Sequence, residues 1–357
     1  MKIVITTDGI FPFSVGGMQR HSRFLVEGLA RNHEDVQLHV IHPHDELIFS
    51  SFENVTEHRL TEYNRHHVYL VDCYRYSQAI GDVLVEIDPD VIYSQGLTMW
   101  GGMKRWGRIT MVNPHGLEPY QAMGMKNRLL AVPFKSAFNF IFKKASKVVS
   151  LGGKLTTILE SVVSPEKIVT LPNGIDLDLF QKREKEPSEF NFLFVGRFAR
   201  NKGITHLIDV SIRLIQEGHS FKLNLIGKGP LYESLCARYQ GLEWIQFFGF
   251  ASDQEIGQAY RNCSTFVLPT LFEGMPTVVL EAMASGAPII VSDVGACKEM
   301  VDAENGWVVE PGNKDDLYQA MKESLRDSFL EDKSRASVEK AQKFSWTEII
   351  RQTIEHL

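Results

Sequence analysis

Short apolar runs alternate with longer amphipathic segments along the chain. The apolar runs are bounded by turn residues and have the length and composition of buried parallel strands. In the first half they lie at 2–7, 36–41, 91–93, 109–112, 147–151 and 168–171. Between several of these runs, the spacing of apolar residues predicts amphipathic helices at 18–31, 76–87 and 156–163. Strands that alternate with helices predict a doubly wound α/β domain.

The same alternation returns in the second half, after a break. A Pro-Asn-Gly turn signal lies at 172–174, and the charged run at 181–189 is typical of a solvated linker. Strands are then predicted at 192–195, 221–226, 244–247, Thr265–Leu268 and 288–291. Helices are predicted at Ile204–Gln216, from 253 onward, and at Thr277–Ala284, 315–326, 334–344 and 347–357. We therefore expect two α/β domains, 1–172 and 173–344, and a final segment, 345–357.

The composition is that of an ordinary globular protein, with 357 residues of which 44% are hydrophobic and 23% charged. A net charge of −6 argues against general nucleic-acid binding. The N-terminus lacks the pattern of a signal peptide, and no apolar run is long enough to span a membrane. The polar segment 42–65 is expected to be irregular, with its histidines His42, His44 and His58 in solvent. Without CxxC spacing, four cysteines are expected to be reduced, buried thiols of a cytosolic protein: Cys73, Cys236, Cys263 and Cys297.

The stretch 273–291 combines an acidic loop, a short helix and a strand. Glu273 ends the loop, and Pro276 occupies a position that suits the first turn of a helix. The free N–H groups and partial positive charge at a helix N-terminus favour a phosphate. Glu281 lies one turn further along, roughly 6–7 Å away at ~1.5 Å per residue. That spacing resembles the one between the diphosphate and the ribose of a nucleotide, although both glutamates also fit solvated surface positions.

Two other strand-to-helix turns carry residues suited to phosphate. Glycine in the pair Gly16-Gly17 lets a backbone approach a phosphate closely, although many such turns carry glycine for geometry alone. The turn at 196–203 carries Arg197 and Lys202, which are well placed to neutralise a diphosphate. Fixed cations stabilise concentrated negative charge without needing a metal. Neither turn matches the GxGxxG fingerprint of dinucleotide-binding proteins.

The interval 119–159 contains no acidic residue, although the net charge of the whole chain is negative. Its apolar and aromatic residues are interleaved with seven cations: Lys126, Arg128, Lys135, Lys143, Lys144, Lys147 and Lys154. A basic, aromatic-rich amphipathic helix is typical of binding at an anionic membrane surface. Alternatively, the apolar residues belong to the core, since Phe138, Ile141 and Phe142 fit one helical face that could point into the domain.

The motifs of the second half resemble those of the family 4 retaining glycosyltransferases, which have the GT-B fold. Glu273 and Glu281 are similar to the E-x7-E motif of that family, in which the first glutamate contacts the donor sugar and the second the ribose. Arg197 and Lys202 match the GR and KG pairs that hold the donor diphosphate. The resemblance covers nearly the whole chain and is strongest at 191–309.

The first half carries two further likenesses to this family. Gly16-Gly17 resembles its first-loop glycine pair, but Gln19 stands where the family often has a glutamate. His115-Gly116 follows a predicted buried strand, where open α/β sheets place their ligands, and resembles the HG pair beside the donor sugar and acceptor. A lone histidine is more often structural, so its assignment depends on the family pattern.

The resemblance implies a GT-B fold with two Rossmann-like domains facing across a cleft, the last helix crossing back to the first domain. The first domain is expected to bind the acceptor and the second the nucleotide sugar. His115 and Glu273 are expected to be catalytic. The expected donor-binding residues are Gly16, Gly17, Arg197, Lys202, Gly249, Phe250, Gly274, Met275, Pro276, Thr277, Val278 and Glu281.

The implied activity is retaining hexosyl transfer from a nucleoside-diphosphate sugar to a glycan or lipid-linked acceptor in cell-surface polysaccharide synthesis. No metal or further cofactor is expected. The expected partners are the nucleotide sugar, the acceptor and an anionic membrane surface that binds 119–159, but no nucleic acid. The expected location is cytoplasmic, or peripheral at the inner face of the membrane.

Several alternatives remain open at this point. The transferase could act on a small soluble acceptor, or the chain could be a non-catalytic nucleotide-binding scaffold. A nicotinamide-dependent oxidoreductase on a doubly wound fold is disfavoured by the lack of GxGxxG. The DxD runs at 88–90 and 176–178 resemble metal-binding motifs of the other glycosyltransferase fold, but both lie beside turn signals and fit helix caps or solvated loops.

Overall fold

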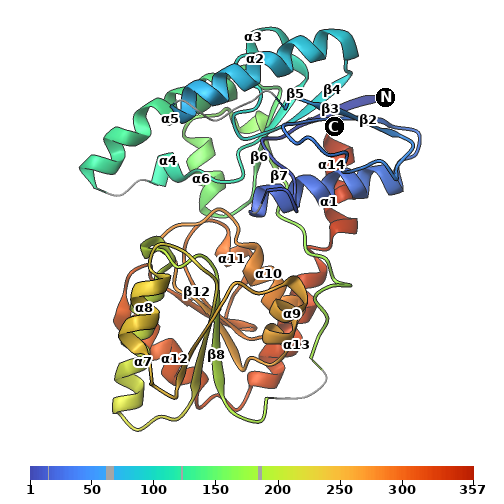
Figure 1. Ribbon diagram of the computed structural model, residues 1–357. Helices are drawn as coiled ribbons and strands as arrows, with labels where there is room; N and C mark the ends of the chain where they lie inside the picture. Colours follow the sequence, from blue (N-terminus) through green and yellow to red (C-terminus); the bar gives the residue numbers. More distant parts are fainter. Residues whose placement is uncertain (15, 62–67, 122–123, 184–186) are drawn as a thin grey trace. The chain divides into compact units, whose positions relative to one another are not determined.

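The chain folds into two compact α/β units (Figure 1). The structure is a computed structural model, and it describes residues 1–357 except 15, 62–67, 122–123 and 184–186. The N-terminal unit comprises Met1–Asn173 and Trp346–Leu357, and the C-terminal unit comprises Gly174–Ser345. Each unit contains one wholly parallel sheet. The predicted pair of Rossmann-like domains is therefore confirmed.

The N-terminal unit is built on a seven-stranded sheet with the order β3-β2-β1-β4-β5-β6-β7. Its strands are β1 (Lys2–Thr6), β2 (Gln37–His42), β3 (Val55–Arg59), β4 (Val91–Gln95), β5 (Thr110–Asn113), β6 (Lys147–Ser150) and β7 (Ile168–Thr170). Its helices are α1 (Gly17–Asn32), α2 (Tyr69–Ile87), α3 (Met103–Trp106), α4 (Glu118–Gln121), α5 (Met125–Lys144), α6 (Lys154–Glu160) and α14 (Trp346–His356), with 3-10 turns η1 (Gly107–Ile109) and η2 (Pro165–Lys167).

The end of the chain belongs to the core of this unit. Helix α14 packs against α1, and Ile350 joins the buried cluster that α1 and the central strands form. Gly28 of α1 makes this approach possible, because a Cβ at that position would lie 2.6 Å from a methylene carbon of Ile350. Figure 1 shows α14, in red, beside the blue α1.

The prediction that 42–65 is irregular and its histidines solvated was wrong at 55–59 and at His42, while 62–65 lie outside the described residues. β3 forms within this segment and pairs with β2 as an edge strand. His42 is fully buried, and its Nε2 lies 3.0 Å from Oε2 of Glu57. The Glu57 carboxylate also accepts hydrogen bonds from the N–H groups of Ile48 and Phe49. Strand β3 has a polar sequence because Glu57 accepts hydrogen bonds from the backbone of the preceding loop. A search for apolar periodicity does not detect such a strand.

The C-terminal unit is built on a six-stranded sheet with the order β10-β9-β8-β11-β12-β13. Its strands are β8 (Asn191–Val195), β9 (Lys222–Ile226), β10 (Ile245–Gly249), β11 (Thr265–Leu268), β12 (Ile289–Ser292) and β13 (Gly306–Val309). Its helices are α7 (Ile204–Gln216), α8 (Tyr232–Tyr239), α9 (Asp253–Arg261), α10 (Thr277–Ala284), α11 (Cys297–Met300), α12 (Lys314–Ser324) and α13 (Leu330–Gln342), with a 3-10 turn η3 (Arg200–Lys202).

Two groups of helices cover this sheet on opposite sides (Figure 1). Helices α7 and α12 pack together on one side, and α10 packs with α9 and α13 on the other. Part of the segment 181–189 lies outside the described residues, but Arg183 is buried and donates from Nη1 to the carbonyl oxygen of Cys263 at 2.7 Å. The prediction of a wholly solvated linker was therefore wrong at Arg183.

The four cysteines are free thiols, but only two of them are buried. Cys263 and Cys297 are inaccessible, whereas Cys73 and Cys236 are half-buried. The prediction of four buried thiols was therefore wrong for Cys73 and Cys236. Each of these two lies on a helix with one face toward solvent, and a count of cysteines does not distinguish the faces.

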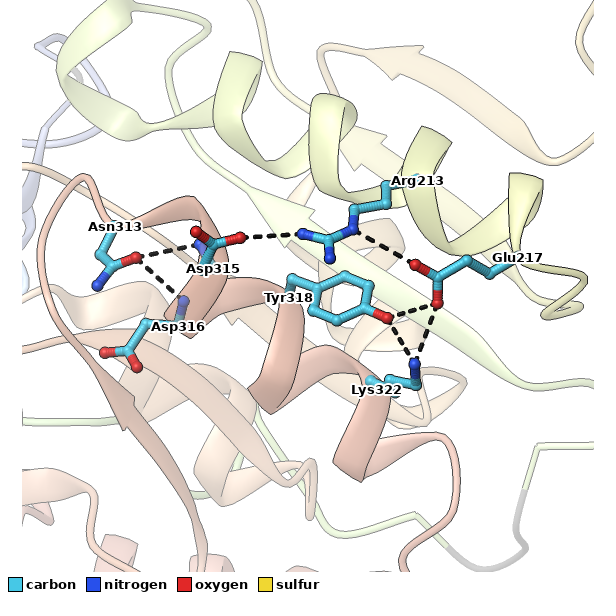
Figure 2. Close-up of polar contacts among 7 residues, drawn as sticks. All are labelled: Arg213, Glu217, Asn313, Asp315, Asp316, Tyr318 and Lys322. Atoms are coloured by element: carbon cyan, nitrogen blue, oxygen red, sulfur yellow. Dashed lines mark hydrogen bonds and ion pairs between the residues drawn. The ribbon is translucent and has the colours of Figure 1, made fainter.

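Helices α7 and α12 are joined by a polar network at the surface (Figure 2). Figure 2 shows the hydrogen bond from Arg213 to Asp315. Nη1 of Arg213 lies 2.9 Å from Oδ1 of Asp315, and the guanidinium carbon lies 3.8 Å from the centre of the Tyr318 ring. The carboxylate of Glu217 accepts hydrogen bonds from the hydroxyl of Tyr318 and from Nζ of Lys322. These contacts hold the pKa of Glu217 at about 2, with the Tyr318 hydrogen bond as the largest cause and Lys322 next.

Lowering the pH below about 4.5, the usual pKa of a glutamate, is expected to reduce the stability of the C-terminal unit through Glu217. The folded state holds this carboxylate ionised down to a pKa of about 2, so its contribution is present above the unfolded pKa and is lost as the pH falls toward 2. Glu217→Gln should therefore flatten the pH dependence of urea denaturation between about pH 2 and 4.5. Asp253→Asn, on α9, is the control variant. Parallel pH profiles for the wild type and Glu217→Gln would contradict the assignment.

Candidate functional site

In the C-terminal unit, the order in which the chain adds strands to the sheet reverses between β8 and β11. Strands β9 and β10 lie on one side of β8, and β11, β12 and β13 on the other. Open α/β sheets bind ligands at the carboxyl ends of the strands at such a switch point. The loops that leave β8 and β11 are 196–203 and 269–276, which carry the predicted diphosphate and sugar contacts. The topology therefore brings both predicted loops to one edge of one sheet.

The loop after β8 is anchored by the buried side chain of Phe198. Phe198 is fully buried, and its backbone N–H donates to the carbonyl oxygen of Lys228 at 3.0 Å. Gly227 permits this contact, since its φ is +134° and an added Cβ would overlap the carbonyl oxygen of Gly196. Arg197, directly before the anchor, is exposed. The buried phenylalanine thus presents the neighbouring cation to solvent.

Lys202 reaches the loop after β11. Gly203 has a φ of +68°, and a Cβ there would overlap the carbonyl oxygen of Pro269, so the two loops approach at backbone distance. The N–H of Leu271 donates to the carbonyl oxygen of Asn201 at 2.7 Å. Nζ of Lys202 forms an ion pair with the carboxylate of Glu273, and both side chains remain partly exposed. The structure therefore brings together two residues that lie 71 positions apart in the chain.

A second glycine holds the Glu273 loop from the other side. Gly295, after β12, has a φ of +51°, and a Cβ there would overlap the carbonyl oxygen of Gly274. The next residue, Ala296, donates its N–H to that same carbonyl oxygen at 2.9 Å. Gly274, Met275 and Pro276 are all buried. The loop that carries Glu273 is thus fixed by the loops that follow β8 and β12, a constraint that no local sequence motif displays.

Helix α10 begins as predicted, with Pro276 as its N-cap and Thr277 as its first residue. Thr277 and Val278 are partly exposed, and the N–H groups of a first helical turn have no partner within the helix. One turn on, Glu281 is only 9% exposed. Its Oε2 accepts a hydrogen bond of 2.9 Å from the hydroxyl of Tyr260 on α9.

Tyr260 holds the carboxylate of Glu281 in place, a contact that sequence reasoning missed. Its side chain is fully buried, and it contacts the ring of Phe266 on β11 with centroids 5.6 Å apart. In sequence it reads as one of the apolar positions of an amphipathic helix, so only its hydrogen bond to Glu281 reveals the role. A buried tyrosine hydroxyl needs such a partner, and here the partner is a predicted ligand-binding glutamate.

Tyr260→Phe is expected to weaken donor binding about tenfold, because the buried carboxylate of Glu281 loses a charge-assisted hydrogen bond that fixes its rotamer. Calorimetry with uridine diphosphate and other nucleoside diphosphates measures this change. Tyr318→Phe on the remote α12 is the matched control and should bind normally. A merely structural role would lower the melting temperature of Tyr260→Phe without changing the affinity of the folded protein.

The remaining predicted contact of this unit is Gly249-Phe250, at the end of β10. Gly249 has a φ of +67°, and its carbonyl oxygen accepts from the N–H of Gly227 at 2.7 Å. The Phe250 ring is 76% exposed. The pair therefore lies beside the loop at 227–229, which in turn holds Phe198.

In the N-terminal unit the switch point lies between β1 and β4. The predicted pair follows β1: Gly16 is the N-cap of α1, and Gly17 is its first residue. A Cβ on Gly16 would overlap Oε1 of Gln19, whereas Gly17 faces open space. Nε2 of Gln19 lies 3.3 Å from Oδ1 of Asp8, so the residue that departs from the family pattern binds a neighbouring carboxylate.

His115 lies just past β5 in a left-handed conformation with a φ of 57°. Its Nε2 is 2.9 Å from Oε1 of Gln95, and its ring makes an edge contact with His21 at 4.7 Å between centroids. Its N–H donates to Oδ1 of Asn113 at 2.9 Å. Burial, together with the neighbouring His21, holds the pKa of His115 well below its usual value of 6.5. The imidazole is therefore neutral at physiological pH, and its strained backbone is maintained by the surrounding hydrogen bonds.

A cavity of about 580 Å³ opens at the carboxyl edge of the N-terminal sheet. It lies against Asp8 after β1, 96–98 after β4, and Pro114 and Gly116 on either side of His115. Helices α2 and α5 form most of its remaining walls, with Met18 of α1 and Glu118 and Pro119 of α4. Its volume and position are those of a small-molecule site in an open α/β sheet.

Two absences among the described residues bear on metals and membranes. In that part of the chain no cluster of three or more His, Cys, Asp or Glu side chains is arranged to hold a metal ion. Among the helices described here, none combines the length and apolar character needed to cross a bilayer.

Comparison with known families assigns both halves of the chain. Residues 15–179 match the model of Glycosyltransferase Family 4, and residues 189–327 match that of Glycosyl transferases group 1. An uncharacterized glycosyltransferase of Methanocaldococcus jannaschii is 27% identical over 350 residues, which cover 95% of this chain and 93% of the relative. In Campylobacter jejuni, N-acetylgalactosamine-N,N'-diacetylbacillosaminyl-diphospho-undecaprenol 4-alpha-N-acetylgalactosaminyltransferase is 28% identical over 247 residues, 66% of each chain.

Solved structures share the fold over nearly the whole chain. Sucrose-phosphate synthase from Thermosynechococcus elongatus has a TM-score of 0.85 at 20% identity, covering 99% of this chain and 98% of the other. HepE of Anabaena, in complex with UDP and glucose, has a TM-score of 0.72 at 19% identity, covering 100% and 99%. With the two family models, these similarities identify the chain as a GT-B glycosyltransferase of the family 4 type.

Proposed function

We propose that this glycosyltransferase moves a sugar from a nucleoside-diphosphate sugar to a glycan or lipid-linked acceptor and retains the anomeric configuration. The observation that carries the proposal is the meeting of Lys202 with Glu273 beside the start of α10, at the switch point of the C-terminal sheet. A fixed cation, an acid and a helix N-terminus suit the diphosphate and the sugar of one donor. HepE, which has this fold and was solved with UDP and glucose, supports this class of donor.

The donor contacts follow from this arrangement. Arg197, Lys202 and the N–H groups of Thr277 and Val278 bind the diphosphate. Gly274 and Met275 offer their backbone N–H groups to the sugar, since Pro276 has none to give. Glu281, held by Tyr260, accepts from the ribose hydroxyls. Gly249 and Phe250 lie beside the base.

Glu273 exchanges partners when the donor binds. In this structure its carboxylate neutralises Lys202. A bound diphosphate competes for the same ammonium group, because its charge is larger and its oxygens are better placed for charge-assisted hydrogen bonds. The carboxylate then turns to the sugar hydroxyls. The ion pair thus holds both side chains in place before the donor arrives.

Transfer proceeds by front-face attack. The acceptor oxygen forms a bond to the anomeric carbon on the face from which the diphosphate departs, and the bond from that carbon to the β-phosphate oxygen breaks. The acceptor proton passes to the departing phosphate oxygen. Arg197, Lys202 and the start of α10 stabilise the negative charge that develops there. His115, neutral and hydrogen-bonded, orients sugar hydroxyls, and Gly16-Gly17 lets backbone approach the donor phosphates.

The acceptor is proposed to be a glycan or a lipid-linked saccharide. The Campylobacter jejuni relative is named for a diphospho-undecaprenol acceptor, and an Escherichia coli relative is named O-antigen chain mannosyltransferase B. A small soluble acceptor is the alternative. The basic interval 119–159 favours the former, through its proposed contact with an anionic membrane surface at the cytoplasmic face.

Helix α5 has features of both alternatives for that interval. Its second half is core, since Phe138, Ile141 and Phe142 are buried. Its first half instead exposes apolar side chains beside Lys126 and Arg128: Met125, Leu129, Leu130 and Val132 are between 52% and 80% exposed. We place the membrane contact on this first half. Sedimentation with anionic vesicles tests it, and equal, negligible binding to anionic and neutral vesicles points to a soluble acceptor.

A thermal-shift screen against nucleotide sugars, followed by a transfer assay with the best donor, tests the proposed reaction. A true donor should raise the melting temperature in a concentration-dependent way. Proton NMR of the product then reports whether the anomeric configuration is retained. A screen without any nucleotide-sugar shift would refute the donor site, and an inverted product would refute the front-face mechanism.

A further inference from the structure

We infer that the cavity between α2 and α5 binds the aliphatic chain of an amphiphilic acceptor, whose sugar lies at the carboxyl edge of the N-terminal sheet. This inference rests on the proposed function, because it names the class of acceptor. The cavity lies wholly within the N-terminal unit. At about 580 Å³ it can enclose a drug-sized group.

The wall that the two helices form is mainly apolar, although Asp72 of α2 also lines the cavity. Leu130, Phe134 and Phe138 of α5 line it, with Tyr69 and Tyr76 of α2 opposite. The rings of Tyr69 and Phe134 stack with centroids 6.0 Å apart, which joins the two helices at the rim. Leu130 and Tyr69 are 63% and 55% exposed, although both line the cavity. An apolar wall that continues into exposed apolar residues suits a chain that enters from the surface and extends beyond it.

The opposite end is polar and acidic. Asp8 and Glu118 line it, and the Glu118 carboxylate lies over the backbone of Gly116, beside His115. An ionised carboxylate has about four acceptor sites and can receive several sugar hydroxyls. The same charge disfavours a phosphate within the cavity. The geometry therefore fits neutral sugar hydroxyls at the sheet and hydrocarbon between the helices.

The cations explain where an anionic linker would lie. Lys126 and Arg128 stand on the exposed first turns of α5, outside the cavity and about two turns before Phe134. A phosphate or diphosphate that links the sugar to the aliphatic chain would therefore meet these cations at the rim of the cavity and not inside it. The rim also continues into the surface that we propose for the membrane, so a chain could pass from one to the other without crossing water.

Cys73 provides a probe that does not depend on catalysis. It is half-buried and lines the cavity, whereas the half-buried Cys236 lies in the C-terminal unit. Decyl glucoside below its micellar concentration should slow alkylation of Cys73 by at least about fivefold, because ligand pockets bury most of the surface of their ligand. Methyl glucoside should not slow it, and Cys236 should react at an unchanged rate in both cases. Mass spectrometry of the digested protein measures both rates.

Matched variants on α5 separate the cavity from the membrane surface. Leu130→Gln and Val132→Gln both replace an exposed aliphatic residue, but only Leu130 lines the cavity. Leu130→Gln should lower the affinity for decyl glucoside about tenfold, and Val132→Gln should leave that affinity unchanged. Ala131→Phe, which places a ring in the cavity wall, should abolish the protection of Cys73. A normal circular-dichroism spectrum and melting temperature verify that each variant is folded.

The outcomes distinguish this inference from the proposed function. If nucleotide sugars bind but Cys73 is not protected by decyl or farnesyl glucoside, the cavity assignment is wrong and the donor site stands. If Cys73 is protected while no nucleotide sugar binds, the donor site fails and the cavity assignment stands. Stronger protection by the farnesyl chain indicates an isoprenoid carrier, and stronger protection by the decyl chain an acyl lipid. Equal effects of Leu130→Gln and Val132→Gln would assign the contact to the surface and overturn the inference.

Discussion

Glu273→Gln is expected to reduce the turnover of sugar transfer about 100-fold or more, while the affinity for nucleoside diphosphate stays within about threefold of the wild type. The amide keeps the shape of the side chain but removes the charge that faces the donor sugar. Its partner Lys202 loses an ion pair and becomes more available to the diphosphate, so nucleotide affinity should hold or rise slightly. Steady-state kinetics and calorimetry on the same preparation measure both quantities.

Glu310→Gln is the matched control for this prediction. Glu310 is an exposed glutamate of the same unit, just after β13. It should retain full turnover and full affinity. Full activity in Glu273→Gln would reject the catalytic assignment. A large loss of nucleotide affinity with unchanged turnover would instead assign Glu273 to binding. An interaction that is equally strong in the bound substrate and in the transition state contributes to affinity and not to turnover.

Lys202→Ala is expected to weaken the binding of nucleoside diphosphate by about 10- to 100-fold, because a charge-assisted hydrogen bond contributes about 1.5–3 kcal/mol. Turnover should fall as well, since the same cation stabilises the charge on the departing diphosphate. The salt dependence of binding should become weaker, because one cation fewer contacts the ligand. Calorimetry at low and high ionic strength measures the affinity and its slope.

Lys314→Ala is the control for this second variant. Lys314 forms an ion pair with Asp209 on the α7–α12 face, so its removal changes the net charge of the protein equally without touching the loops after β8 and β11. If both variants weaken the nucleotide by the same factor, the effect comes from net charge and the diphosphate assignment is wrong. Lys202→Arg should recover part of the affinity, because it restores the charge with a different donor geometry.

Much of the fold was predictable from apolar periodicity. Strands such as β8 and β11 are continuous apolar runs with a loop and a helix after each, and that pattern has few alternatives to a doubly wound sheet. The start of α10 at Thr277 was also predictable, because proline favours the beginning of a helix, although the structure makes Pro276 the N-cap and not a residue of the first turn. Strand β3 was not predictable, since its polar residues are stabilised by contacts with a loop and with β2.

The residues of the candidate site were likewise predictable only in part. Some site residues could be found from the sequence, because they lie at characteristic positions in strand-to-helix turns. These are Glu273, Lys202 and the pair Gly16-Gly17. Tyr260 and Gly295 do not stand out. One acts through a hydrogen bond between helices, and the other through a backbone contact between loops.

The two-domain α/β class and the residue types suited to a diphosphate were predictable, because strand and helix periods and turn chemistry are local properties of the chain. Three features appear only once the chain is folded: Lys202 meets Glu273, Tyr260 holds Glu281, and a cavity opens between α2 and α5. These are contacts between segments far apart in the chain. They depend on strand order and on close backbone approach at a few glycines, which no local pattern encodes.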